Sequence, residues 1–87
     1  MLIVNQQTLT SKSVASNTQV DFTATPTAVT GYKPIGVAGA HTLDGVVFLV
    51  GAVYNASDDQ IIFTVRNSYN SSRNVAPRVD MLYIRSI

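Results

Sequence analysis

The sequence predicts an all-β domain, a small antiparallel β-sandwich of about six strands with a jelly-roll-like order of connections. Short apolar runs recur along the chain and are separated by residues typical of turns. No run of any length shows the helical repeat of apolar positions. One run, residues 46–54, is apolar on both faces and requires cover on both sides.

Residues 46–54 (VVFLVGAVY) are too few to cross a membrane as a helix, and their valines and aromatics favour a strand. Successive side chains of a strand point to opposite faces. One face carries Val46, Phe48 and Val50, and the other carries Val47, Leu49 and Val53. We therefore expect a central strand that is buried on both sides.

The first two segments of the chain are expected to differ in regularity. Residues 1–12 begin apolar and become polar, which fits either a first strand or an arm against a neighbouring subunit, and residues 13–87 form the sandwich domain. Residues 13–17 are a polar turn. Residues 18–25 alternate, with Val20, Phe22 and Ala24 facing inward, before Pro26 ends the strand.

Residues 31–43 are predicted to form an irregular strand. Pro34 restricts this strand to the edge of a sheet, while Gly36 and Gly39 indicate bulges. The Asp44-Gly45 pair that follows is a strong hairpin signal, because both central residues of a type I′ turn need positive φ. The hairpin would pair residues 32–42 with residues 46–54.

Two further strands complete the prediction. Residues 61–67 (IIFTVRN) alternate, with Ile61, Phe63 and Val65 facing inward. After Pro77, the last strand runs to Ile87 and places Met81 and Tyr83 on one side. Its other side carries Leu82 and Ile84.

If each strand reverses the direction of the previous one, the connections sort into two ends. Residues 13–17, 41–45 and 67–74 gather at one end, called the loop end below. Residues 26–30 and 55–60 gather with both termini at the other, the terminal end. A rigid β scaffold commonly carries binding residues on such clustered loops.

Composition favours self-association. The 87-residue chain is 46% hydrophobic and only 13% charged, and a domain of this size buries about 60% of its unfolded surface. It has no cysteine to add a disulfide. Apolar residues on both faces of two strands predict a subunit interface, formed by Val47, Leu49, Val53, Leu82 and Ile84.

The charges argue against several partners. Six Lys and Arg residues and five acidic residues are scattered singly, with a net charge of +1, so we expect no nucleic-acid binding. The start of the chain has no charged n-region and no long apolar run, so neither a signal peptide nor membrane insertion is predicted.

No catalytic, metal or cofactor motif is found, and none of these functions is predicted. A base at His41 oriented by Asp44 would need a nucleophile that the sequence does not place. Asp58 and Asp59 offer too few oxygens for Ca²⁺, which takes six to eight. Asn55 and Asn70 match the glycosylation pattern by chance, in turns rich in Asn and Ser.

The surface residues most suited to binding lie in the predicted loops of the loop end. Tyrosine provides a stacking face, and Asn and Arg provide hydrogen bonds, a mixture typical of adaptable binding loops. A solvated polar loop is the alternative interpretation. The candidate receptor-binding residues are His41, Asp44, Tyr69, Asn70 and Arg73.

Three segments resemble the small β-sandwich modules that end bacteriophage tail-fibre, receptor-binding and head-fibre proteins. They are residues 31–37 (GYKPIGV), 65–67 (VRN) and 81–86 (MLYIRS), in the order found in that family. The resemblance covers residues 31–87. It implies a homotrimeric, non-enzymatic protein of the virion, made in the bacterial host cytoplasm, that contacts other virion proteins and a host-surface glycan.

The chain departs from a tail fibre in length, because no extended shaft precedes the module. A capsid decoration or head-fibre protein is therefore the alternative. Such a protein would attach to the phage shell and need no specific ligand. Loss of cell or glycan binding on mutation of Tyr69 and Arg73 would separate adhesion from decoration.

Overall fold

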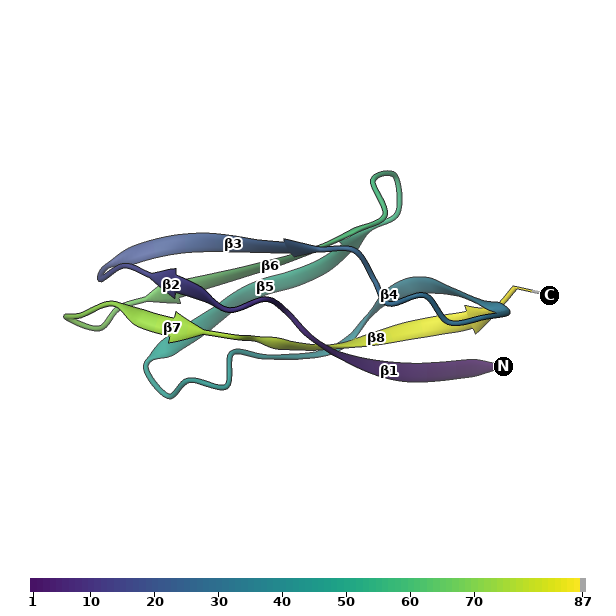
Figure 1. The fold of residues 1–87 in the computed structure, drawn as a ribbon, viewed down its shortest axis with the longest axis horizontal. Coiled ribbons are helices and arrows are strands. Elements are labelled where there is room, and N and C mark those ends of the chain that lie inside the picture. The colour runs from purple at the N-terminus through teal and green to yellow at the C-terminus, as the bar shows by residue number, and fades with distance from the viewer. Residues whose placement is uncertain (87) are drawn as a thin grey trace.

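The computed structural model describes residues 1–86 and shows an all-β chain with eight strands in three antiparallel sheets (Figure 1). No helix occurs in this part of the chain. The strands are β1 (Leu2–Thr8), β2 (Lys12–Val14), β3 (Thr18–Ala24), β4 (Tyr32–His41), β5 (Val47–Asn55), β6 (Gln60–Asn67), β7 (Arg73–Val75) and β8 (Arg78–Arg85).

The two larger sheets have the strand orders β1-β8-β4 and β3-β6-β5, and β2 pairs with β7. The central strands are therefore β8 and β6. The prediction that residues 46–54 form a central strand was wrong, because β5 lies at a sheet edge. The strand count exceeds six because β2 and β7 fall in segments predicted as connections or as an irregular strand start.

The predicted alternation of β6 and β3 is confirmed. Ile61, Phe63 and Val65 are fully buried, and Phe22 of β3 lies opposite Phe63. The two rings pack edge to face, with centroids 6.4 Å apart and an interplanar angle of 84°. This arrangement is favourable beyond the area it buries.

The edge position and the bulges predicted for β4 are also confirmed. β4 is an edge strand, and its register with β8 shifts between Pro34 and Gly36 and again between Val37 and Gly39. Gly39 lies against Asp80, because a Cβ added at position 39 would stand 2.8 Å from the Asp80 Oδ2. A side chain at position 39 would therefore require the Asp80 carboxylate to move.

The predicted hairpin between β4 and β5 was wrong. β4 pairs with β8 and β5 pairs with β6, so the connection crosses between sheets. Positive φ occurs at Leu43 (59°) and not at Asp44 or Gly45. The Asp44 side chain instead accepts a hydrogen bond from the Val46 amide at 2.9 Å, which closes a local Asx-turn over residues 44–46.

A bulge in β5 changes which side chains share a face. The register with β6 shifts between Leu49 and Gly51, so the residues after the bulge change face relative to a regular strand. Val53 lies opposite Ile62 and therefore shares the outer face with Phe48, not with Val47. The predicted faces are therefore correct for Val47, Leu49 and Phe48 and wrong for Val53.

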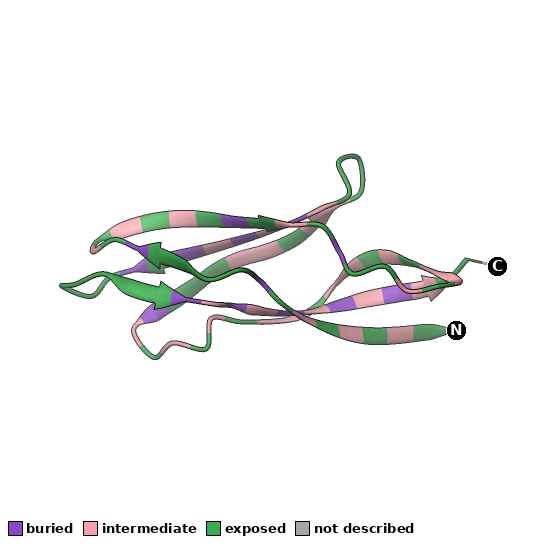
Figure 2. Ribbon diagram, viewed as in Figure 1, coloured by how far each residue is buried: buried purple, intermediate pink, exposed green. Residues whose placement is uncertain are grey.

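The buried side chains of all three sheets form one hydrophobic cluster. Figure 2 marks the buried positions along the ribbon. The members lie mainly on β6 and β8, and Met81 and Tyr83 of β8 are fully buried as predicted. The Tyr83 hydroxyl donates a 2.6 Å hydrogen bond to the Thr27 carbonyl, which satisfies its buried polar end. The predicted last residue of this strand, Ile87, lies outside the described residues.

β1 pairs with β8 along its whole length, from Leu2 opposite Ile84 to Thr8 opposite Arg78. Residues 2–8 thus form a strand of the chain's own sheet.

The molecule is elongated, with extents of 49 × 22 × 17 Å. The N-terminus and the C-terminal end of β8 lie at one end, and the β2–β3 and β6–β7 connections lie at the other, as predicted (Figure 1). Within residues 1–86, no helix has the length and apolar character needed to cross a membrane.

Candidate functional site

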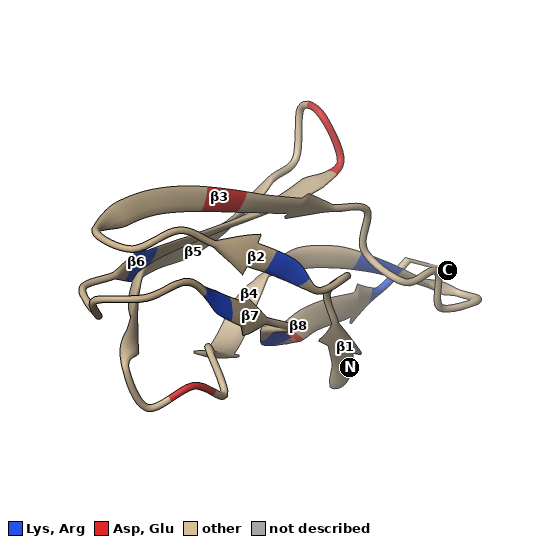
Figure 3. Cartoon of the chain, turned by 60° about the vertical axis from the view of Figure 1, so that its left-hand side comes forward, with Lys and Arg blue, Asp and Glu red and all other residues tan. Residues whose placement is uncertain are grey.

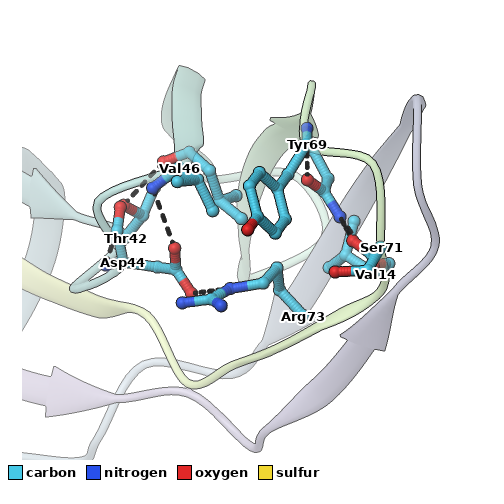
Figure 4. Close-up of polar contacts among 9 residues, drawn as sticks. Val14, Thr42, Asp44, Val46, Tyr69, Ser71 and Arg73 are labelled. Atoms are coloured by element: carbon cyan, nitrogen blue, oxygen red, sulfur yellow. Dashed lines mark hydrogen bonds and ion pairs between the residues drawn. The ribbon is translucent and has the colours of Figure 1, made fainter.

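Hydrogen bonds join the connections at the loop end (Figure 4). The Ser16 hydroxyl donates to the Tyr69 carbonyl at 2.7 Å, which ties the β2–β3 turn to the β6–β7 connection. The third connection lies between β4 and β5. Its Asp44 accepts a hydrogen bond from Arg73, the first residue of β7, which follows the β6–β7 connection. The three connections therefore form one surface on a fixed scaffold.

Asn67, the last residue of β6, organises this surface. Its side chain is fully buried, and its Nδ2 donates to the Val14 and Ser71 carbonyls, both at 3.0 Å. Its Oδ1 accepts from the Tyr69 amide at 2.9 Å. The sequence interpretation missed this role. Because alternate residues of a strand share a face, the inward-facing series Ile61, Phe63 and Val65 continues to position 67 and could have indicated it.

Asp44 is a buried carboxylate held by several donors. Its side chain is only 8% exposed, its Oδ1 accepts from the Val46 amide, and its Oδ2 accepts from the Arg73 Nε at 3.1 Å. The Val46 hydrogen bond is the main cause of a lowered Asp44 pKa, with Arg73 adding to it against the cost of burial. Asp44 therefore neutralises Arg73 and fixes its orientation.

Tyr69 and Arg73 also contact each other. The Arg73 guanidinium lies 5.7 Å from the centroid of the Tyr69 ring, a cation–π distance. Tyr69 also lines a hollow of about 240 Å³, together with Gly45, Val46, Phe48 and Ser68. Asn70 is exposed beside Tyr69 in the sequence. The loop end thus has an aromatic wall with polar groups next to it.

His41 does not belong to this cluster. Its Nε2 lies 3.4 Å from the Asp80 Oδ2, on the outer face of the β1-β8-β4 sheet. The Arg78 Nε lies 3.9 Å from the other oxygen of Asp80. The predicted receptor-binding set is therefore divided: Asp44, Tyr69 and Arg73 are brought together, and His41 pairs elsewhere.

The predicted interface residues occupy different environments. Val47 is only 3% exposed and belongs to the core of its own subunit, so it cannot form an outward surface. Leu49 and Val53 are exposed, and Leu82 and Ile84 are half-buried. Val47 faces the core because it pairs with Asn67, a buried residue of β6.

Charged residues are dispersed over several strands and connections (Figure 3). In the described part of the chain, no three His, Cys, Asp or Glu side chains are placed to hold a metal ion together. Asp58 and Asp59 are engaged locally, by Asn55 and Tyr54 respectively.

No protein-family model matches this chain, and comparison with curated proteins and with solved structures found no significant similarity.

Proposed function

We propose that this chain is a non-enzymatic structural protein of a phage virion that binds a host-surface glycan through its loop end. The two three-stranded sheets would act as the layers of a small sandwich that supports the binding loops. The observation that carries the proposal is the contact of Tyr69 with an Arg73 that Asp44 holds in place. The virion setting rests on the resemblance of residues 31–37, 65–67 and 81–86 to phage fibre modules.

The charge balance favours a neutral sugar over an anionic one. Asp44 already compensates the charge of Arg73, so an anion would gain little net attraction there. The apolar C–H face of a sugar ring can pack on Tyr69, whose side chain is half-exposed, while Phe48 lines the adjoining hollow. Sugar hydroxyls can accept hydrogen bonds from the terminal nitrogens of Arg73.

Homotrimerisation is supported by two apolar patches on different sheets. The β5 patch consists of Phe48, Val50 and Val53, all more than half exposed. The β1 patch lies on the outer face of the β1-β8-β4 sheet, where Leu2 pairs with Ile84 and Val4 with Leu82. Two different patches on one subunit suit a head-to-tail contact, which closes into a ring when the rotation allows.

Loose folding does not account for these exposed side chains. The accessible surface of 5023 Å² is close to the roughly 5,000 Å² of a compact monomer with this mass. The chain thus completes its fold and still leaves apolar patches exposed, a feature of association surfaces.

The second candidate is a capsid decoration or head-fibre protein that attaches to the phage shell without a specific ligand. The same apolar patches favour it, because they could hold the chain in an assembly without any role for the loop end.

A binding assay separates the two candidates. We expect Tyr69→Ala and Arg73→Gln to lower binding to an array of bacterial surface oligosaccharides at least tenfold, which is roughly the loss of one hydrogen bond to a charged group or one stacking contact. Arg85→Gln, an exposed arginine of β8, is the matched control and should bind like the unchanged protein. Equal binding by all variants would contradict a glycan site at the loop end, and no binding even by the unchanged protein would favour decoration.

A further inference from the structure

Two hollows of the surface lie at the terminal end, away from the loop end. One, of about 350 Å³, lies between the β3–β4 connection and Tyr83, and the other, of about 570 Å³, extends to Tyr54. Both are lined by Lys33, Pro34 and Asp59, so the two hollows adjoin at these residues and are described together as one groove. We call it the tyrosine groove, because it contains Tyr32, Tyr54 and Tyr83, three of the four tyrosines of the chain.

Asp59 is held in a defined position on the wall of this groove. The Tyr54 hydroxyl donates a 2.7 Å hydrogen bond to its Oδ1, a length typical of a charge-assisted bond. The backbone of Asp59 has a φ of 52°, which is uncommon for a residue other than glycine. Among residues 1–86 no hydrogen bond to the second carboxylate oxygen is found, so Oδ2 can accept one from a ligand.

The negative charge of Asp59 affects the tyrosines around it. Its hydrogen bond is the main cause of the raised Tyr54 pKa, with burial and charge adding to it. The Tyr83 pKa is raised mainly by burial and further by the Asp59 charge. Asp59 therefore lies close enough to influence both rings, in agreement with the shape of the groove.

The chemistry of the lining indicates a class of ligand. Apolar rings of Tyr32 and Tyr54 offer packing surfaces, while one Lys33 ammonium and one Asp59 carboxylate give a donor and an acceptor with no net charge. Ligand sites are commonly concave and mostly apolar, with a few fixed polar groups, and the two volumes are in the usual range of several hundred Å³.

We propose that the tyrosine groove is a second binding site, for a neutral pyranose unit whose hydroxyls bind Asp59 and Lys33 and whose C–H face packs on a tyrosine ring. Adjacent hydroxyls of a pyranose can donate to a carboxylate and accept from an ammonium at the same time. This site lies at the opposite end from Tyr69 and does not depend on the loop-end proposal.

The test uses the whole chain and the methyl glycosides of glucose, galactose and N-acetylglucosamine as probes. Each is titrated while the tyrosine ring resonances are followed by NMR. We expect at least one glycoside to shift the rings of Tyr54 and Tyr32 with a Kd of roughly millimolar strength, without shifting Tyr69 in the same titration range. The absence of any shift in these rings up to saturating glycoside would overturn the proposal.

Two matched variants test the role of the carboxylate. Asp59→Asn keeps an acceptor for Tyr54 and suits positive φ, since Asn tolerates that conformation, but it removes the charge. It should weaken glycoside binding about tenfold. Asp58→Asn changes the neighbouring carboxylate, which is bonded to Asn55 and does not line the groove, and should leave binding unchanged.

Three outcomes contradict the assignment. Equal weakening by Asp58→Asn and Asp59→Asn would mean that the fixed carboxylate has no specific role. Shifts centred on Tyr69 would locate the glycoside at the loop end. Shifts of Tyr54 and Tyr32 with a proline-rich peptide, and none with the glycosides, would identify the groove as a peptide site.

Discussion

β5 and β6 are neighbouring strands of similar apolar character, but they differ in position within the sheet and in burial. β6 is central and regular, with Ile61, Phe63 and Val65 fully buried. β5 is an edge strand with a bulge, and its Phe48 and Val53 are 59% and 56% exposed. Apolar content alone therefore does not decide burial; the number of paired neighbours and the phase of the strand decide it.

The largest expected effect comes from the same substitution made on both strands. Phe63→Ala removes a fully buried ring that packs on Phe22 and should lower the free energy of unfolding by about 3 to 5 kcal/mol. Phe48→Ala removes an exposed ring and should change it by less than about 0.5 kcal/mol, measured on the monomer. Urea denaturation at low protein concentration gives both values. Similar losses would remove the distinction between the two strands.

A second prediction concerns the polar end of the buried face of β6. Asn67→Ala leaves two carbonyls and the Tyr69 amide without their partner and should cost about 2 to 3 kcal/mol. Asn74→Ala, an exposed asparagine of β7, is the control and should have little effect. If the two variants are equally stable, Asn67 does not hold the loop end together.

The difference between β5 and β6 also shows what the sequence can and cannot determine. Alternation and the glycine and proline positions depend on local sterics, so the inward residues of β6 and the bulges of β4 were predicted correctly. Which strands pair depends on contacts far apart in the sequence. The Asp44-Gly45 pair predicted a hairpin, but in the structure the Asp44 side chain accepts a hydrogen bond from the Val46 amide and the hairpin does not form. The β5 bulge lies next to Gly51, a signal of the same kind that the sequence interpretation did not use, and it reversed the expected position of Val53.

The candidate site was predictable to a similar extent. Tyr69 and Arg73 were recognised from their residue types, and the antiparallel order predicted that Asp44 would lie at the same end. The partner of His41 depended on the pairing of β4 with β8, which the sequence did not indicate. The link between Tyr54 and Asp59 across the β5–β6 turn was likewise not anticipated.

A smaller effect on the stability of the fold is expected at acidic pH. The lowered pKa of Asp44 means that its charged form stabilises the folded state above the pKa of the unfolded chain, about 3.9, and that this contribution is lost as the pH falls through the lower folded value. Asp44→Asn should reduce stability by less than about 1 kcal/mol at neutral pH, because Arg73 is partly exposed. Thermal unfolding between pH 6 and about pH 2.5 should converge for the two proteins at the acidic end. A constant difference would show that the Asp44 charge contributes nothing.

The proposed trimer depends on the claim that other copies of the chain cover the β5 and β1 patches. Sedimentation equilibrium tests it directly by measuring the mass in solution. We expect three times the 9.4 kDa of the single chain, and a shift to the single-chain mass in the Phe48→Ser and Val53→Ser double variant without loss of its folded structure. A single-chain mass for the unchanged protein at millimolar concentration would contradict the claim.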